Sequence, residues 1–364
     1  MDLPARFPPE FRLLLACLQD NSDGFSKVHP EKFSPEQWTR FLQLARRHRV
    51  EILLASYVKG SEEGFPPSVI ENIQKRSLRG RQKNLKLKAS LFRILNLLDT
   101  SGIRALAIKG PALAMQFYPD PDTRQARDLD ILVDPEKIQE TVKLLLQHDY
   151  VFGSREEERW FTRKSTSFHK VFPHLGMTDS KTGMRLELHW RLFTFREFEP
   201  GKFDELWNCK TLLQQDALAI HTLSAADHFR YICLHGLFHG FYQLPWIRDV
   251  AMALQHSIPW TEIQKKAAKE GTLAMIQLAV QFAGYFFPAA APEVLMNEPA
   301  DEDFMEQARA FSMRCLIAGG QTELTGTGMR IRRARFFRRI HRMAGISGWN
   351  YAGYLIRKGW LRIF

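Results

Sequence analysis

Two aspartates at the start of an apolar run place the tightest constraint on how this chain of 364 residues can fold. Asp128 and Asp130 are separated by one residue and lead into the apolar run 131–133, which is typical of a buried strand. Side chains at positions i and i+2 of a strand project from the same face, roughly 7 Å apart along the backbone. The two carboxylates can therefore converge on cations held about 3.5–4 Å from each other. Hard oxygen ligands of this kind suit Mg²⁺.

A second predicted strand supplies a third carboxylate. Between 184 and 190 the residues alternate, so that Glu187 and His189 share one face while Leu186, Leu188 and Trp190 share the other. This alternation predicts a half-buried antiparallel strand. Glu187 is therefore the natural third carboxylate of the site.

A glycine turn upstream is typical of a phosphate site. The short strand predicted at 104–108 is followed by Lys109, Gly110 and Pro111, and a helix is expected from 112 to about 117. A glycine lets the backbone approach a ligand, and the unpaired N–H groups of the helix start attract anions. Lys109 adds a positive charge beside them.

Two arginines lie between the glycine turn and the aspartates. Arg124 follows a polar turn and has two competing interpretations, a phosphate contact or a solvated loop side chain. Arg127 precedes Asp128, and we expect it on the opposite face of the strand, paired with an acidic neighbour.

At these residues the chain resembles the nucleotidyltransferases of the DNA polymerase β-like superfamily, in which a glycine turn, an Asp-x-Asp strand and a later carboxylate occur in this order. It is most similar to an uncharacterised bacterial nucleotidyltransferase family with a KG, R, DxD and ElHW pattern. The resemblance implies that Asp128, Asp130 and Glu187 are catalytic and hold two Mg²⁺ ions, and that Lys109 and Gly110 receive a nucleoside triphosphate (NTP). The turn reads Gly-Pro here, where the superfamily usually has Gly-Ser or Gly-Gly.

The resemblance also implies a reaction, in which a nucleoside monophosphate passes from the NTP to an acceptor and pyrophosphate is released. A small molecule, a peptide and an RNA are the open alternatives for the acceptor. Two other functions compete: a catalytically silent nucleotide-binding or interaction protein, and an RNA-modifying nucleotidyltransferase. The second of these would use the basic residues near the C-terminal end and those of a long helix expected at about 67–98, which are Lys75, Arg76, Arg79, Arg81, Lys83, Lys86 and Lys88.

The pattern of elements predicts an α+β fold. A nucleotidyltransferase palm with a mixed sheet and helices is expected at 101–215, where strand and helix patterns alternate. Helical patterns predict an N-terminal helical region at 1–100 and a C-terminal helical region at 216–364. The uncharged stretch 271–292 contains glutamines and a proline, which favours a buried helix over a membrane span.

Nearly all of the excess charge lies in the last tenth of the chain. The whole chain has a formal charge of +11, whereas residues 329–364 contain nine Arg and one Lys with no Asp or Glu. Aromatic residues follow the arginines in this basic aromatic tail. Three interpretations compete: contact with a polyanion, contact with a membrane surface, and a helix whose aromatic side chains dock on the core.

Histidines and cysteines give weaker indications. His235 and His239 are four residues apart, with Asp249 downstream, so a zinc site competes with packing between helices or lining of the substrate pocket. His169, in a strand-like segment, is either on the face of the active site or structural. Four scattered cysteines without metal-ligand spacing, and no apparent signal peptide, predict a cytoplasmic location, with a peripheral membrane contact of the tail as an alternative.

Overall fold

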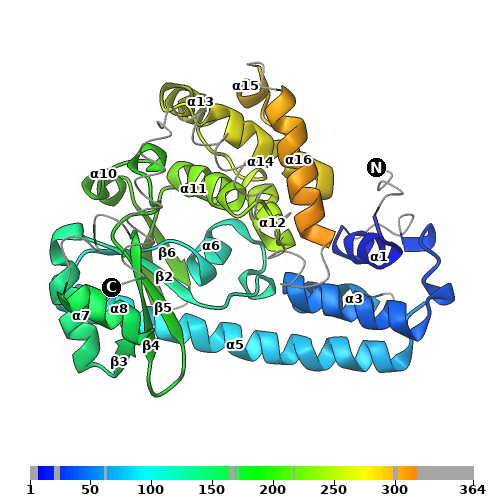
Figure 1. The fold of residues 1–364 in the computed structure, drawn as a ribbon, viewed down its shortest axis with the longest axis horizontal. Coiled ribbons are helices and arrows are strands. Elements are labelled where there is room, and N and C mark those ends of the chain that lie inside the picture. Colours follow the sequence, from blue (N-terminus) through cyan, green and yellow to red (C-terminus); the bar gives the residue numbers. More distant parts are fainter. Residues whose placement is uncertain are drawn as a thin grey trace.

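The structure is a computed structural model that describes residues 7–19, 25–60, 64–163, 169, 172–215, 218–297 and 302–317. The basic aromatic tail lies outside the described residues, so its contact with a polyanion or a membrane surface stays a prediction. Figure 1 shows a sheet with helices on both sides, a helical region at the N-terminal end of the chain and another formed by its C-terminal part.

The N-terminal helices begin with clear sequence signals. Ser34 caps the second of them and forms a capping box with Gln37, and Pro residues occupy the first turn of three of the four. The last one is 34 residues long and runs along the lower part of the view in Figure 1 towards the sheet. The helices are α1 (Pro9–Leu18), α3 (Pro35–His48), α4 (Glu51–Gly60) and α5 (Pro67–Thr100).

Seven strands form one mixed sheet in the order β3-β4-β5-β2-β1-β7-β6. The predicted α+β fold with a mixed sheet is confirmed. The strands are β1 (Ala105–Ala107), β2 (Leu129–Val133), β3 (Tyr150–Phe152), β4 (His174–Asp179), β5 (Arg185–His189), β6 (Thr211–Gln215) and β7 (Leu218–Thr222). β7 belongs to the sheet although it lies past residue 215, while the division into three regions stays a prediction.

The expected antiparallel arrangement of the Glu187 strand is only half right. β5 is antiparallel to β4, with which it forms a hairpin, but it runs parallel to β2. The reason is the connection, because the chain leaves β2, passes through a helix and β3, and returns along β4 before it enters β5.

The remaining helices cover the sheet and build the C-terminal region. Those of the palm are α6 (Gly110–Phe117), α7 (Ile138–Gln147), α8 (Arg155–Arg163) and α10 (Phe203–Asn208). Those that follow are α11 (Ala225–Phe238), α12 (Leu244–Ala253), α13 (Trp260–Lys269), α14 (Leu273–Phe286), α15 (Glu293–Met296) and α16 (Glu302–Ile317). Short 3₁₀ turns lie at Pro30–Lys32, Pro121–Thr123, Pro135–Lys137 and Arg196–Phe198.

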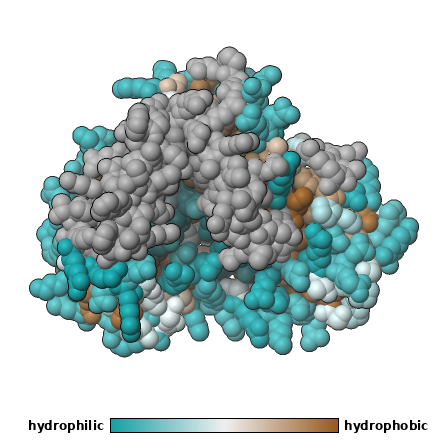
Figure 2. Space-filling model, in the orientation of Figure 1, coloured by the Kyte–Doolittle hydropathy of each residue, from teal (hydrophilic) through white to brown (hydrophobic). Residues whose placement is uncertain are grey.

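The buried helix predicted within 271–292 is confirmed by α14, whose residues are buried on nearly all sides. Within the described residues, none of the helices has both the length and the apolar character that crossing a membrane would need. Figure 2 shows that the described surface at the lower edge of this view, where Figure 1 places α5, is largely hydrophilic.

The two faces of the sheet belong to different hydrophobic cores. Ala107 and Ile131 pack in one core with the second half of α5 and with α7. Ile108 and Leu132, which point the opposite way, join a larger core shared with the N- and C-terminal helices. Since Asp130 alternates with Ile131, it lies on the face of this larger core, where a helical region can cover it.

His48 joins three helices and should make the stability of the protein depend on pH. Its Nδ1 accepts from the backbone N–H of Leu244 at 3.3 Å, and its Nε2 donates to the carbonyl oxygen of Leu316 at 3.1 Å. Burial, and then the charge of Arg47, lower the pKa of His48 to about 3. Folding therefore favours the neutral ring, whose stabilising contribution is complete above a pH of about 6.5 and is lost as the pH falls towards 3.

We expect the variant His48→Gln to lose part of this pH dependence. The free energy of unfolding in urea, compared between pH 7.5 and pH 4.5, should change by about 2–3 kcal/mol less in the variant than in the wild type. Equal changes in the two proteins would show that His48 is not the titrating group.

Candidate active site

Two of the three predicted carboxylates face each other across neighbouring strands. In the parallel pair β2–β5, Asp130 is the register partner of Glu187, and the backbone N–H of Ile108 donates to the carbonyl oxygen of Asp130 at 3.0 Å. The Asp130 side chain is 3% exposed and that of Glu187 is 34% exposed. Asp128 lies just before β2 and is half-buried. The site therefore has a buried interior and an opening to solvent at Glu187.

The glycine turn is fixed against the Asp-x-Asp strand. Gly110 has a φ of +56°, in the left-handed region that favours glycine, and a Cβ atom there would lie 3.3 Å from the carbonyl oxygen of Asp128. This close approach brings Lys109 over the strand, where its Nζ forms an ion pair with Asp130. Lys109 thus lies among the carboxylates, and Gly110 lets the turn reach them.

The charges of the carboxylates influence one another. Burial, and then the charges of Asp130 and Glu187, raise the pKa of Asp128. For Glu187, burial favours the neutral form, but the hydrogen bond to His189 and nearby positive charges outweigh it and lower the pKa. Burial of the Lys109 ammonium is likewise outweighed, chiefly by Asp130, so that its pKa is raised. Like charges held this close together create a strong requirement for cations.

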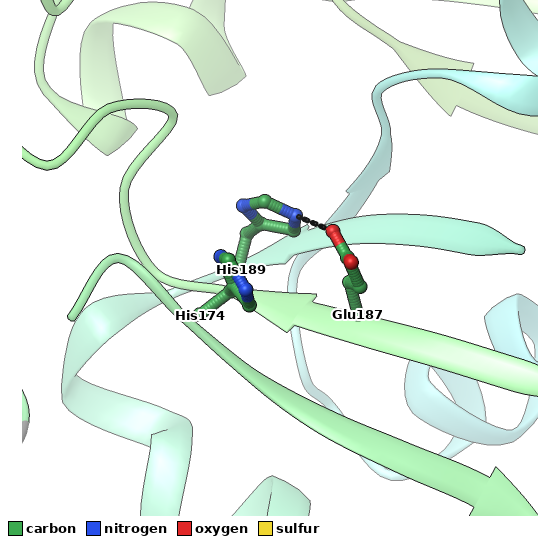
Figure 3. A group of neighbouring side chains, drawn as sticks. All are labelled: His174, Glu187 and His189. Atoms are coloured by element: carbon green, nitrogen blue, oxygen red, sulfur yellow. Dashed lines mark ion pairs between the residues drawn. The ribbon is translucent and has the colours of Figure 1, made fainter. Parts of the chain in front are cut away.

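Two histidines belong to this site beside the carboxylates. His189 Nε2 lies 3.3 Å from Asp130 Oδ1 and 3.4 Å from Glu187 Oε2. His174 on β4 is the register partner of His189, and their ring centroids are 4.8 Å apart. Figure 3 shows the rings of both histidines beside the Glu187 carboxylate. Among the described residues, His174, Glu187 and His189 are the one group of metal-ligating side chains whose ligand atoms all lie within 4.8 Å of one another.

Arg124 is held by a buried carboxylate. Its Nε and Nη2 donate to the two oxygens of Asp249 on α12 at 2.7 and 2.8 Å, and its Nη1 donates to the carbonyl oxygen of Gly110 at 3.4 Å. Tyr118 also donates to Asp249, at 2.6 Å. Arg124 therefore ties the glycine turn to the C-terminal helices, while a contact to a phosphate stays a prediction.

Three further positive side chains from distant segments gather near Asp128. Arg49 follows α3, Lys83 lies on α5, and Arg127 is exposed on the loop before β2. Burial, and then the charge of Arg127, lower the pKa of both Arg49 and Lys83, whereas Asp128 has the opposite influence. We refer to Arg49, Lys83 and Arg127 as the cation group. Within the described residues no ion pair of Arg127 with an acidic side chain is found, in contrast to the expected pairing.

The other histidines lie in aromatic surroundings. His235 and His239 have ring centroids 4.6 Å apart and pack against Trp246, at 5.5 and 5.0 Å. Asp249, the acidic ligand of the alternative zinc site, pairs with Arg124 instead, so packing describes these two histidines better.

The strand expected around His169 is wrong at that residue, because His169 has helical backbone geometry. The ring of His169 packs on Trp190 with centroids 4.8 Å apart. Trp190 belongs to the core on the other face of the sheet, which explains why His169 does not join His174 and His189.

A comparison with known protein families gives one match. A family model described as an uncharacterised nucleotidyltransferase matches residues 34–288, which include the whole sheet and all the site residues described above. The chain belongs to this nucleotidyltransferase family. The predicted family and the transferase class are thereby confirmed. No curated protein matches the chain.

Some residues of the site in this nucleotidyltransferase could not be predicted from the sequence, because strand pairing and helix packing bring them there. The alternation around Glu187 already places His189 on the face of the carboxylates, so a signal for it exists. His174 and Arg49 carry no local signal, because their positions depend on the pairing of β4 with β5 and on the packing of α3. Lys83 is among the basic residues predicted on the long helix, but its influence on the site depends on the packing of α5.

Proposed function

We propose that this nucleotidyltransferase moves a nucleoside monophosphate from an NTP to an acceptor hydroxyl or phosphate, releasing pyrophosphate in a reaction that depends on Mg²⁺. The observation that carries the proposal is the pairing of Asp130 with Glu187 on adjacent strands, with Asp128 two residues away. Negative charges that lie close together and are partly removed from water are costly unless cations share them. Their oxygen atoms are the ligands that Mg²⁺ prefers, so the donors present fit this ion.

The side chains of the site would have different roles in the reaction. Asp128, Asp130 and Glu187 would hold the divalent ions, and Lys109 would offset the remaining charge of Asp130. Glu187, whose side chain is 34% exposed, is placed to accept a proton from an acceptor hydroxyl that enters from solvent. When bound, divalent ions lower the pKa of the attacking group and neutralise the leaving pyrophosphate.

The cation group would bind the triphosphate. Arg49 and Lys83 come from different segments, are repelled by Arg127 and are attracted by Asp128, so an anionic ligand bound beside them would relieve the repulsion. Gly110 leaves the backbone of the turn open to the same ligand. Lys109 pairs with Asp130 and would therefore balance the charge of the carboxylates.

We expect Lys83→Ala and Arg127→Ala each to raise the KM for NTP by about tenfold while kcat changes less. The reason is that a charge which binds the ground state and the transition state alike affects KM rather than turnover. Steady-state kinetics at two salt concentrations would measure this, and the loss should be smaller at high salt because the interaction is screened.

Lys75→Ala is the matched control, because Lys75 is an exposed lysine earlier on the same helix. It should leave the KM unchanged. An unchanged KM in both the Lys83 and Arg127 variants would exclude the cation group as the triphosphate site.

A direct screen tests the proposed reaction. The purified chain, Mg²⁺ and each of the common NTPs are incubated with small-metabolite, peptide and RNA fractions, and pyrophosphate is measured. Pyrophosphate that appears only with one fraction would identify the acceptor class. Tight NTP binding that requires Mg²⁺, without pyrophosphate from any fraction, would instead favour the catalytically silent nucleotide-binding protein.

A further inference from the structure

The hydrogen bonds of His189 leave one of its nitrogens facing two carboxylates. Its Nδ1 lies 3.2 Å from the carbonyl oxygen of Arg191, which can only accept, so Nδ1 must carry the proton of the neutral ring. The Nε2 lone pair of that neutral ring then faces Asp130 Oδ1 at 3.3 Å and Glu187 Oε2 at 3.4 Å. Lys109 Nζ already offsets the charge of Asp130, whereas the contact of His189 Nε2 with Glu187 Oε2 needs either a second proton on the ring or a metal ion between the two atoms.

His174 supplies a second nitrogen at the same place. Its Nδ1 is buried and has no hydrogen-bond partner among the described residues. A buried imidazole nitrogen without a partner is an uncommon and costly feature that a bound metal ion would relieve.

We propose that His174, Glu187 and His189 bind a divalent transition-metal ion that accepts imidazole nitrogen, such as Zn²⁺ or Co²⁺, next to the Mg²⁺ site of Asp128 and Asp130. Two imidazoles and one carboxylate favour such an ion over Mg²⁺, which prefers oxygen ligands. The bond from His189 Nδ1 to a backbone carbonyl is the arrangement that commonly orients a metal-binding histidine. The inference rests on the proposed function and specifies one of its metals.

The positions of the three side chains are close to those that a bound ion needs. Ligand atoms around an ion with bonds of about 2.0–2.2 Å lie roughly 3–3.5 Å apart. The ligand atoms here lie within 4.8 Å of one another, and His189 Nε2 is already 3.4 Å from Glu187 Oε2. Since His174 and His189 are register partners on paired strands, a small side-chain rotation of His174 would complete the site.

The test measures metal binding by the full chain after treatment with a chelator. Co²⁺ is titrated in the presence of millimolar Mg²⁺, and its visible absorption reports nitrogen coordination. We expect one Co²⁺ per chain, displaced by Zn²⁺ but not by Mg²⁺. His174→Ala and His189→Ala should each weaken Co²⁺ binding at least about 100-fold, since losing even an outer partner of a ligand costs about 10–100-fold.

Three further variants make the result specific. His148→Ala removes an exposed imidazole and should bind Co²⁺ like the wild type. Asp128→Asn should keep the Co²⁺ site while it loses nucleotidyl transfer. His174→Gln, which keeps a polar side chain of similar length, replaces His174→Ala if the latter does not unfold cooperatively.

Two results would overturn the inference: Co²⁺ affinity that is unchanged in both histidine variants, or Co²⁺ that Mg²⁺ displaces from the wild type. Because the assay records binding rather than turnover, its outcome is separate from the proposed reaction. If the wild type transfers nucleotides and the histidine variants bind Co²⁺ as tightly as the wild type does, only the metal assignment is refuted. Histidine-dependent Co²⁺ binding without any transfer would refute only the proposed reaction.

Discussion

Replacing Asp130 by Asn is expected to lower nucleotidyl transfer by about a thousandfold or more. Asp130 is the most buried of the three carboxylates and contacts both Lys109 and His189, so loss of its charge changes the centre of the site. The variant keeps the shape of the side chain but removes the negative charge that a divalent ion needs. The initial rate of pyrophosphate release, measured across Mg²⁺ concentrations, would give the size of the loss.

The control for this variant is Glu136→Gln. Glu136 is an exposed carboxylate in the turn after the other end of β2, and its removal should leave the rate unchanged. Thermal unfolding of both variants checks that the fold survives. A rate for Asp130→Asn within tenfold of the wild type would contradict the assignment of Asp130 as a metal ligand.

Replacing Arg124 by Ala is expected to destabilise the protein by about 3–5 kcal/mol, because it leaves a buried carboxylate without its partner. The Asp249 side chain is 3% exposed, and Arg124 donates to both of its oxygens. The free energy of unfolding from urea titration measures the effect. The double variant Arg124→Ala/Asp249→Ala should lose less, since no unpaired charge remains.

A surface ion pair provides the comparison. Lys137 and Glu140 lie 2.6 Å apart but are about half exposed, and Lys137→Ala should change stability far less than Arg124→Ala. Arg124→Ala could instead change the free energy of unfolding as little as Lys137→Ala does and raise the KM for NTP more than tenfold. That result would contradict a structural role of the pair with Asp249 and would identify Arg124 as a phosphate contact, which is one of its two interpretations from the sequence.

The sequence predicts the strands that carry the carboxylates because the information is local. Alternation of apolar and polar residues has a period of two, so the face shared by Glu187 and His189 follows from the order of residues. The same period predicts a common face for Asp128 and Asp130, but Asp128 lies just before β2, where the strand period does not apply. The glycine turn is local in the same way, and its φ of +56° at Gly110 agrees with the choice of glycine.

The parts that could not be predicted depend on long-range packing. Nothing around His174 marks it until β4 pairs with β5 and brings it opposite His189. The direction of β5 relative to β2 depends on the path of the intervening chain rather than on the residues within either strand. Arg124 meets Asp249 across 125 residues of sequence, so neither neighbourhood reveals the other.

The central claim is that this chain transfers a nucleoside monophosphate at the carboxylates of β2 and β5. One NTP is supplied in two forms, labelled at the α-phosphate and at the γ-phosphate, with Mg²⁺ and the active acceptor fraction. We predict that the α label passes to the acceptor, that the γ label appears in pyrophosphate, and that Asp130→Asn abolishes both. Transfer of the γ label to the acceptor, or undiminished transfer of the α label by Asp130→Asn, would contradict the claim.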